Sequence, residues 1–176
     1  MAGERADHID EIVAKWRRAR PELDTGPMEI VGRLFRATAL ADAELTPPLA
    51  GFGLQPGWSD LLAALRRAGA PYELNPTELM RATMLSSGGI TKRLDRLAWA
   101  GLIERRPDPN DRRGTLVRLT RRGKAVIDRA MVVHLANQDR LLRSLGPDQR
   151  RALEDLLRTL LLDLERPAPG TDRPPG

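Results

Sequence analysis

The stretch LSSGGITKRLDRLAWAGLIERRPDPNDRRGTLVRLT, residues 85–120, decides the fold of this 176-residue chain. Small residues at its start suit a turn, and Ile90, Leu94 and Leu97 then recur at helical spacing until Gly101, which is expected to end the helix. Two short β-like runs, LIERRP and TLVRLT, flank the turn-rich DPNDRRG. The stretch therefore predicts a helix followed at once by a basic hairpin.

A second short helix is expected just before this one. Asn75 suits the N-cap, Pro76 the first helical position, and Glu78 the third, where its side chain can complete a capping box. Ser86 or Ser87 can cap the helix that follows the LSSGG turn. Two short helices joined by a tight turn form either a helix-turn-helix or an ordinary helical hairpin. The basic hairpin that follows favours a winged helix.

Positive charge is concentrated in the same region. Residues 92–124 contain 11 Lys and Arg against 4 Asp and Glu, a net charge of +7, whereas the whole chain has 29 against 24, or +5. The rest of the chain therefore sums to −2. A basic stripe on a nearly neutral body indicates a polyanionic partner, because solvated faces usually mix both signs.

The rest of the chain is expected to be helical. Apolar periodicity predicts helices over residues 7–20, 28–45, 58–68, 120–144 and 148–164, with the Pro-rich TPPLAGFGLQPG ending the second. The last helix carries a broad stripe of six leucines: Leu153, Leu156, Leu157, Leu160, Leu161 and Leu164. Such a stripe is buried either against a second copy of the chain or in a single-chain bundle with the first helices. The amount of apolar surface favours the homodimer.

Composition excludes several classes of protein. The chain has no cysteine, so disulfides and thiolate metal sites are excluded, and His8 and His134 lie in no cluster at zinc spacing, so we expect no metal or cofactor. No acid, base and nucleophile converge, so we expect no enzyme. The charged amino end is not a secretory signal and no apolar run reaches the length of a membrane span. A cytoplasmic protein with no membrane partner is expected, associated with the nucleoid when it binds DNA.

Three blocks, LDRL, GLIERRPDPNDRRG and VRLTRRG, resemble the MarR family of multiple-antibiotic-resistance regulators. The resemblance covers about residues 27–164, and the additional amino-terminal helix is similar to that of the PecS-type, urate-responsive branch. It implies a mainly α fold with a small β-hairpin wing, in which dimerisation helices flank a winged helix-turn-helix. The implied segments are an extra helix and turn (1–26), a dimerisation helix (27–52), the winged domain (53–119), carboxy-terminal dimerisation helices (120–165) and a disordered tail (166–176).

The resemblance also implies a function. A homodimer would repress transcription by placing two recognition helices, here about residues 87–100, in successive major grooves of a pseudo-palindromic operator, ~34–36 Å apart. Lys92 and Thr91 would reach base edges or phosphates, while Arg112 and Arg113 would enter the minor groove from the hairpin. The full set of expected DNA contacts is Ser86, Ser87, Thr91, Lys92, Arg96, Arg112 and Arg113.

Members of the urate-responsive branch bind their ligand with a Trp, an Asp and two Arg, which match Trp16, Asp60, Arg93 and Arg105 here. Relatives carry an aromatic residue just before the Asp, whereas this chain has Ser59. The resemblance implies that the two arginines hold a small anionic aromatic ligand such as urate or a related purine. Repulsion between the ligand and Asp60 would then shift the recognition helix and release the DNA.

Other readings remain open. Trp16 could be a core residue, Asp60–Arg93 a static salt bridge and Arg105 a phosphate contact. The effector could instead be a phenolic or other aromatic acid. A nonspecific DNA-binding protein would share the basic stripe but would show no sequence preference in competition with random DNA.

Overall fold

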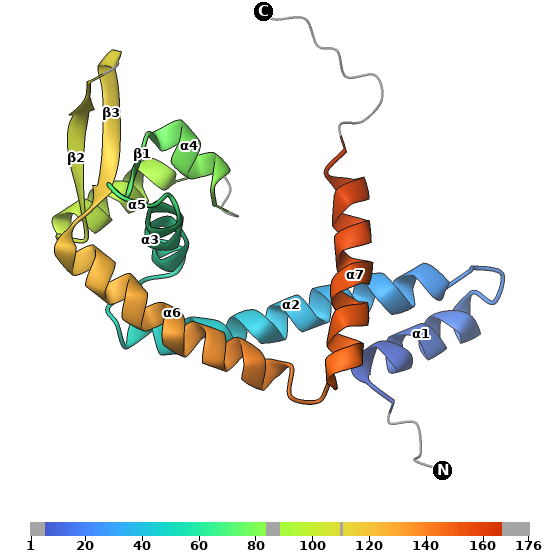
Figure 1. The fold of residues 1–176 in the computed structure, drawn as a ribbon. Helices are drawn as coiled ribbons and strands as arrows, with labels where there is room; N and C mark the ends of the chain where they lie inside the picture. The colour runs from blue at the N-terminus through green and yellow to red at the C-terminus, as the bar shows by residue number, and fades with distance from the viewer. Residues whose placement is uncertain (1–5, 84–88, 110, 167–176) are drawn as a thin grey trace, which may run out of the picture. The chain divides into compact units, whose positions relative to one another are not determined.

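The computed structural model describes residues 6–83, 89–109 and 111–166, without the side chains of Arg112 and Arg113. The fold is mainly helical with one small antiparallel sheet, as predicted (Figure 1). Its elements in chain order are α1 (His8–Ala19), α2 (Gly26–Ala50), α3 (Trp58–Arg67), β1 (Glu73–Leu74), α4 (Pro76–Arg81), α5 (Ile90–Trp99), β2 (Ile103–Asp108), β3 (Asp111–Leu119), α6 (Arg121–Leu141) and α7 (Pro147–Leu164). The chain divides into two compact units, residues 1–137 and 138–176.

The core of the first unit is built around α3. Leu61, Leu62 and Leu65 of this helix are completely buried, as their spacing predicted. Every element from α4 to α6 adds apolar side chains to the same cluster, among them Leu79, Leu97, Val117 and Ile127. Burial of each such side chain contributes about 1.5–3 kcal/mol, so the aliphatic core compensates for the scarcity of aromatic residues.

The two helices of the helix-turn-helix begin differently. At α4 the Asn75 side chain accepts from the Glu78 N–H at 2.9 Å and the Glu78 carboxylate accepts from the Asn75 N–H at 3.0 Å, so the predicted capping box is confirmed. At α5 the N-cap is Gly89, with φ of +82° and no side-chain cap. The predicted start near residue 87 was therefore wrong, because a left-handed glycine begins the helix at Ile90. Ser86 and Ser87 themselves lie outside the described residues.

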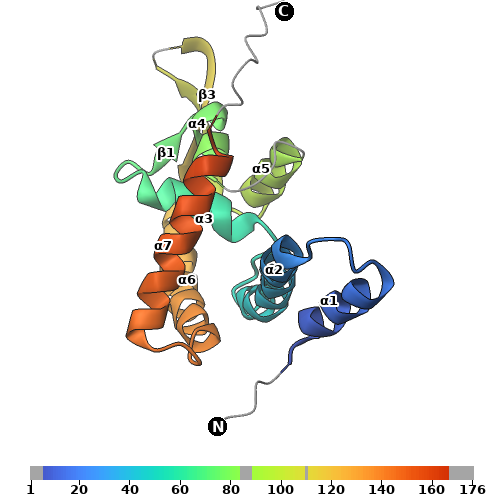
Figure 2. The same cartoon turned by 90° about the vertical axis from the view of Figure 1, so that its right-hand side faces the viewer.

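The wing is larger than the sequence predicted. Strands β2 and β3 form the expected hairpin, which extends beyond the helices of its unit (Figure 2), and β1 adds an unpredicted third strand through Glu73–Arg118 and Leu74–Val117 pairs. Because Asp108 pairs with Asp111, the two strands are already paired within the segment DPNDRRG, which was expected to be a seven-residue loop. Arg112 and Arg113 therefore belong to the start of β3 and not to the tip of a loop.

Helix α1 lies alongside α2 (Figure 1) and is held there by charge and by packing. Arg33 donates to Asp7 at 2.8 Å and to Asp10 at 2.5 Å, and these two carboxylates also make the capping box of α1. Ile9 packs so closely on Gly32 that a Cβ there would lie 3.2 Å from its methyl carbon. The amino-terminal helix is thus a fixed part of the first unit.

Helix α2 continues past the point where its prolines were expected to end it. It runs through Pro47 and Pro48 to Ala50, so the predicted end near residue 45 was wrong. The two prolines lie in the last turn, where the carbonyls they leave without helical partners belong to the exposed Ala43 and Glu44 and can bind water. Past the prolines, Leu49 packs against the core.

Helix α6 begins where the sequence predicted. The Thr120 hydroxyl accepts from the Gly123 N–H at 2.9 Å and donates to the Gly101 carbonyl at 2.8 Å, so one side chain caps α6 and ties it to the end of α5. Gly123 approaches Leu102 so closely that a Cβ at Gly123 would overlap the Leu102 carbonyl. The junction of helix-turn-helix, wing and α6 is therefore rigid.

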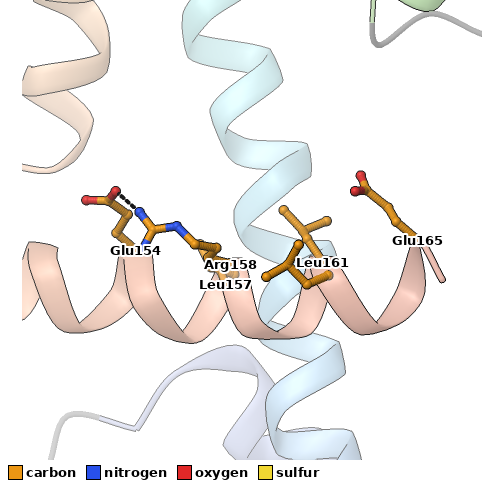
Figure 3. A pocket seen from close by; sticks show the side chains of 6 residues that line it. Glu154, Leu157, Arg158, Leu161 and Glu165 are labelled. Carbon is orange, nitrogen blue, oxygen red and sulfur yellow. Dashed lines mark hydrogen bonds and ion pairs between the residues drawn. The ribbon is translucent and has the colours of Figure 1, made fainter.

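The second unit consists of the end of α6, a turn and α7. Arg150 fastens this turn by donating to the carbonyls of Leu142 and Leu145 and by pairing with Asp139. Helix α7 buries none of its residues, and Figure 3 shows Leu161 between the Glu154–Arg158 pair and Glu165. Within the described residues, no helix is both long and apolar enough to cross a membrane.

Candidate nucleic-acid interface

Helix α5 presents its polar side to solvent. Leu94 and Leu97 are buried, whereas Thr91, Lys92 and Arg96 are exposed, so the helix separates an apolar core face from a cationic outer face. This division follows from the i, i+4, i+7 spacing of Ile90, Leu94 and Leu97, which leaves Lys92 and Arg96 on the opposite side of the helix. Three of the seven predicted DNA contacts thus lie together on one accessible surface.

The other four predicted DNA contacts have no described side chain. Ser86 and Ser87 fall outside the described residues, and the backbones of Arg112 and Arg113 lie at the start of β3. A cation near the end of a protruding hairpin can reach a narrow minor groove. Their contact with DNA remains a prediction.

Two other wing arginines are engaged in ion pairs on one face of the sheet. Glu73 Oε2 lies 3.8 Å from Nη1 of Arg106 and 4.0 Å from Nε of Arg118, whose Nη1 lies 4.0 Å from Glu104. Nε of Arg118 also donates to the Pro71 carbonyl at 3.2 Å. Some of the positive charge that we expected to face a polyanion is therefore neutralised in part by carboxylates of the sheet.

Arg105 lies on the opposite face of the sheet, toward α5. Its Nη2 is 2.7 Å from Oδ1 of Asp95, which directly precedes Arg96 and lies about one turn after Lys92 on α5. Arg105 also lines a hollow of about 230 Å³, together with Pro76, Ile90, Thr91, Leu94 and Thr115. One cation at the edge of a small apolar hollow is suited to an anionic aromatic molecule.

The four predicted ligand-binding residues lie on four different elements. Trp16 is 44% exposed on the outer side of α1, where it lines a hollow of about 240 Å³ with Ile12, Lys15 and Ala19. Asp60 is half-buried in the first turn of α3. Arg93 is half-buried on α5, and its side chain folds back toward the start of the helix, where a Cβ added to Gly89 would lie 3.8 Å from Nη1 of Arg93. Trp16 is not a core residue of the single chain, and the joining of these residues into one site remains a prediction.

The hollow beside Arg105 was missed by reasoning from the sequence. Its lining comes from α4, α5 and β3 as well as β2, so residues as distant as Pro76 and Thr115 meet there. None of these has a residue type or spacing that indicates a ligand. The one available signal was Arg105 itself, whose strand position places its side chain on the face opposite Arg106.

The known proteins to which this chain is similar are transcription regulators. A sequence profile of the MarR family matches residues 52–114. The chain is 37% identical over 149 residues to the HTH-type transcriptional regulator PecS of Dickeya dadantii, which covers 85% of this chain and 90% of PecS.

Two solved structures extend this result. Mutant MarR from E. coli, complexed with operator DNA, is 29% identical with a TM-score of 0.67, over 83% of this chain and 97% of that chain. Bordetella bronchiseptica BpsR, whose DNA binding is regulated by 6-hydroxynicotinic acid, is 25% identical with a TM-score of 0.66, over 75% and 98% respectively. All of these relatives are regulators rather than enzymes.

Proposed function

Since the chain belongs to the MarR family of transcription regulators, we propose that it binds a pseudo-palindromic operator as a homodimer and releases it when a small anionic aromatic ligand binds. The observation that carries this proposal is the exposed cationic face of α5 beside a protruding basic hairpin. In this arrangement Thr91, Lys92 and Arg96 contact the major groove and the phosphates that border it. Arg112 and Arg113, carried by the wing, contact the adjacent minor groove.

Unburied apolar surface supports the homodimer. Helices α2 and α7 bury none of their residues, although both carry large apolar side chains. The most exposed of these are Ile30 and Phe35 on α2 and Leu156 and Leu164 on α7, and Val132 on α6 is exposed to a similar extent. Each apolar side chain covered by a second copy contributes about 1.5–3 kcal/mol, so covering this set favours association strongly.

Two arrangements of the ligand are consistent with the residues. A urate-like anion would be held by Arg93 and Arg105 with Trp16 and Asp60, as in the PecS-type, urate-responsive branch that this chain resembles. An aromatic carboxylic acid would instead occupy the hollow beside Arg105 and displace Asp95 from that arginine. The second arrangement is favoured by the hollow beside Arg105 and by the relative whose DNA binding is regulated by an aromatic acid.

The experiment is a gel-shift titration on a duplex from the protein's own promoter region, with excess random DNA as competitor. We expect a complex that survives the competitor and is dissociated by urate or by an aromatic acid such as salicylate. A monomeric protein without preference over random DNA would refute the proposal.

Variants then separate the two arrangements. Asp60→Asn and Arg93→Ala should weaken the response to urate alone if the four-residue site is correct. Only Arg105→Ala should weaken the response to salicylate. An undiminished urate response in both Asp60→Asn and Arg93→Ala would remove the four-residue site.

A further inference from the structure

Trp99, the last residue of α5, is the most exposed large apolar side chain in the described part of the chain, at 93%. Exposed apolar residues are common singly, but a tryptophan is the largest of them and its indole N–H can only donate a hydrogen bond. Helix α5 does not need this side chain for its packing, since Leu94 and Leu97 already fill the core. The side chain is therefore available for contact with a partner outside the chain.

The helical position of Trp99 indicates which partner. At 100° per residue, Trp99 lies about 20° around the helix from Lys92, with Arg96 between them along the axis. This stripe is opposite the buried leucines. Trp99 is therefore on the cationic face that the proposed function assigns to DNA.

Distance along the helix places Trp99 at the border of the groove. Seven residues of α5 advance about 10 Å, and the major groove of B-DNA is ~12 Å wide. When Lys92 near the start of α5 is at the base edges, the end of the same helix face comes to the sugar–phosphate backbone. Phosphate oxygens accept hydrogen bonds, which an indole N–H can provide.

The end of α5 is also held in place. Nη1 of Arg122 donates to the Ala100 carbonyl at 3.1 Å, and Thr120 donates to Gly101 at 2.8 Å. These bonds fix the backbone on which Trp99 stands and bring the positively charged Arg122 to the helix terminus. Contact with a phosphate then costs little more than fixing the two side-chain torsions of the tryptophan.

We propose that Trp99 is an additional DNA contact, which donates its indole N–H to a backbone phosphate at the border of the major groove read by α5. This inference rests on the proposed DNA-binding function. A phosphate carries no sequence information, so the contact adds affinity for operator and random DNA alike. A patch for an acidic protein segment is the competing use of the same surface.

Replacement of Trp99 tests the proposal through affinity and its salt dependence. Trp99→Phe keeps a ring and removes the donor, and we expect about tenfold weaker binding to both promoter and random duplexes, the usual worth of a hydrogen bond to a charged group. The slope of log affinity against log salt should stay unchanged, because tryptophan displaces no counterion. Lys92→Ala, as the matched control, should lower that slope by about 1.

Fluorine NMR of the full chain labelled with 5-fluorotryptophan gives an independent reading. We expect DNA to shift the Trp99 resonance, assigned by its loss in Trp99→Phe, and to leave the core Trp58 resonance in place. Unchanged affinity of Trp99→Phe together with an unmoved resonance would overturn the inference and leave the surface to a protein partner. If the wild type itself failed to bind DNA, the proposed function would fall as well, so the two failures are distinguishable.

Discussion

Nη2 of Arg105 in the wing lies 2.7 Å from Oδ1 of Asp95 in α5, so one ion pair joins the two parts of the proposed DNA-binding surface. Both side chains are substantially exposed, and such a pair contributes only about 0.2–1 kcal/mol. Its weakness allows a competing anion to break it. A ligand carboxylate in the adjacent hollow would exchange for Asp95 and uncouple β2 from α5.

This competition predicts opposite effects of two substitutions on ligand affinity. Arg105→Ala should weaken binding of salicylate at least about tenfold, because Arg105 is the only cation among the described residues that line the hollow. Asp95→Asn should tighten it several-fold, because the arginine no longer exchanges one carboxylate for another. Isothermal titration calorimetry measures both. Arg106→Ala is the matched control, since Arg106 lies on the other face of the sheet beside Glu73, and equal losses in the two arginine variants would contradict the assignment.

A second prediction concerns acid stability at the junction of α3 and α6. Lys124 and Arg66 donate to the carboxylate of Asp128 at 2.9 and 2.7 Å and hold the pKa of Asp128 below its usual 3.8, with Lys124 the larger cause. Both cations also face the ring of Tyr72. Because the pKa is lower in the folded state, ionised Asp128 stabilises the fold above its ordinary pKa, and this contribution is lost as pH falls through the lowered value.

The substitution Asp128→Asn should therefore reduce the stability at neutral pH and flatten its fall on acidification. Denaturant unfolding followed over a series of pH values measures both effects. Lys124→Met should reproduce part of the flattening by removing the larger cause. An acid profile of Asp128→Asn identical to that of the wild type would contradict the stabilising role of this carboxylate.

A third prediction uses the close approach of α6 to the end of α5. Gly123→Ala would drive a methyl group into the Leu102 carbonyl, which belongs to rigid backbone, so the fold should lose about 3 kcal/mol or more despite the better helix propensity of alanine. Gly51→Ala is the control. Gly51 has φ of −60° and its nearest neighbour to an added Cβ is 3.4 Å away, so that variant should change stability by less than about 1 kcal/mol. Equal melting temperatures for the two variants would rule out the steric account.

The fourth prediction tests the proposed homodimer. Leu156 on α7 is 70% exposed in the single chain, and Leu156→Asp should weaken association roughly 100-fold or more, since the change occurs in both copies and each loses about 1.5–3 kcal/mol. Sedimentation velocity should detect monomer at concentrations where the wild type is dimeric. Arg151→Ala on the same helix, whose side chain is exposed beside Asp148, should leave the dimer intact. Persistence of the dimer in Leu156→Asp would place the interface away from α7.

Much of the helical fold could be predicted because its signals are local. Asn75 and Glu78 satisfy each other's backbone N–H groups within one turn, and Thr120 caps the helix that starts at the next residue. The spacing of Leu61, Leu62 and Leu65 likewise marks the buried side of α3 without reference to any other element. Such interactions join residues three or four positions apart, so the sequence already contains both partners.

The remaining features depend on contacts between distant segments. Strand β1 forms by pairing with β3, where Glu73 lies opposite Arg118. Helix α2 continues past its two prolines, and Leu49 beyond them packs on the core. Arg105 and Asp95 form a pair, although several carboxylates and arginines lie nearby in the chain. Local propensity is worth at most about 1 kcal/mol per residue for ordinary residues, whereas packing and pairing across the fold contribute more. The amino-acid sequence by itself therefore determined the helices and the winged-helix fold class. Contacts between distant segments in the tertiary structure determined the extra strand, the length of α2 and which charged residues pair.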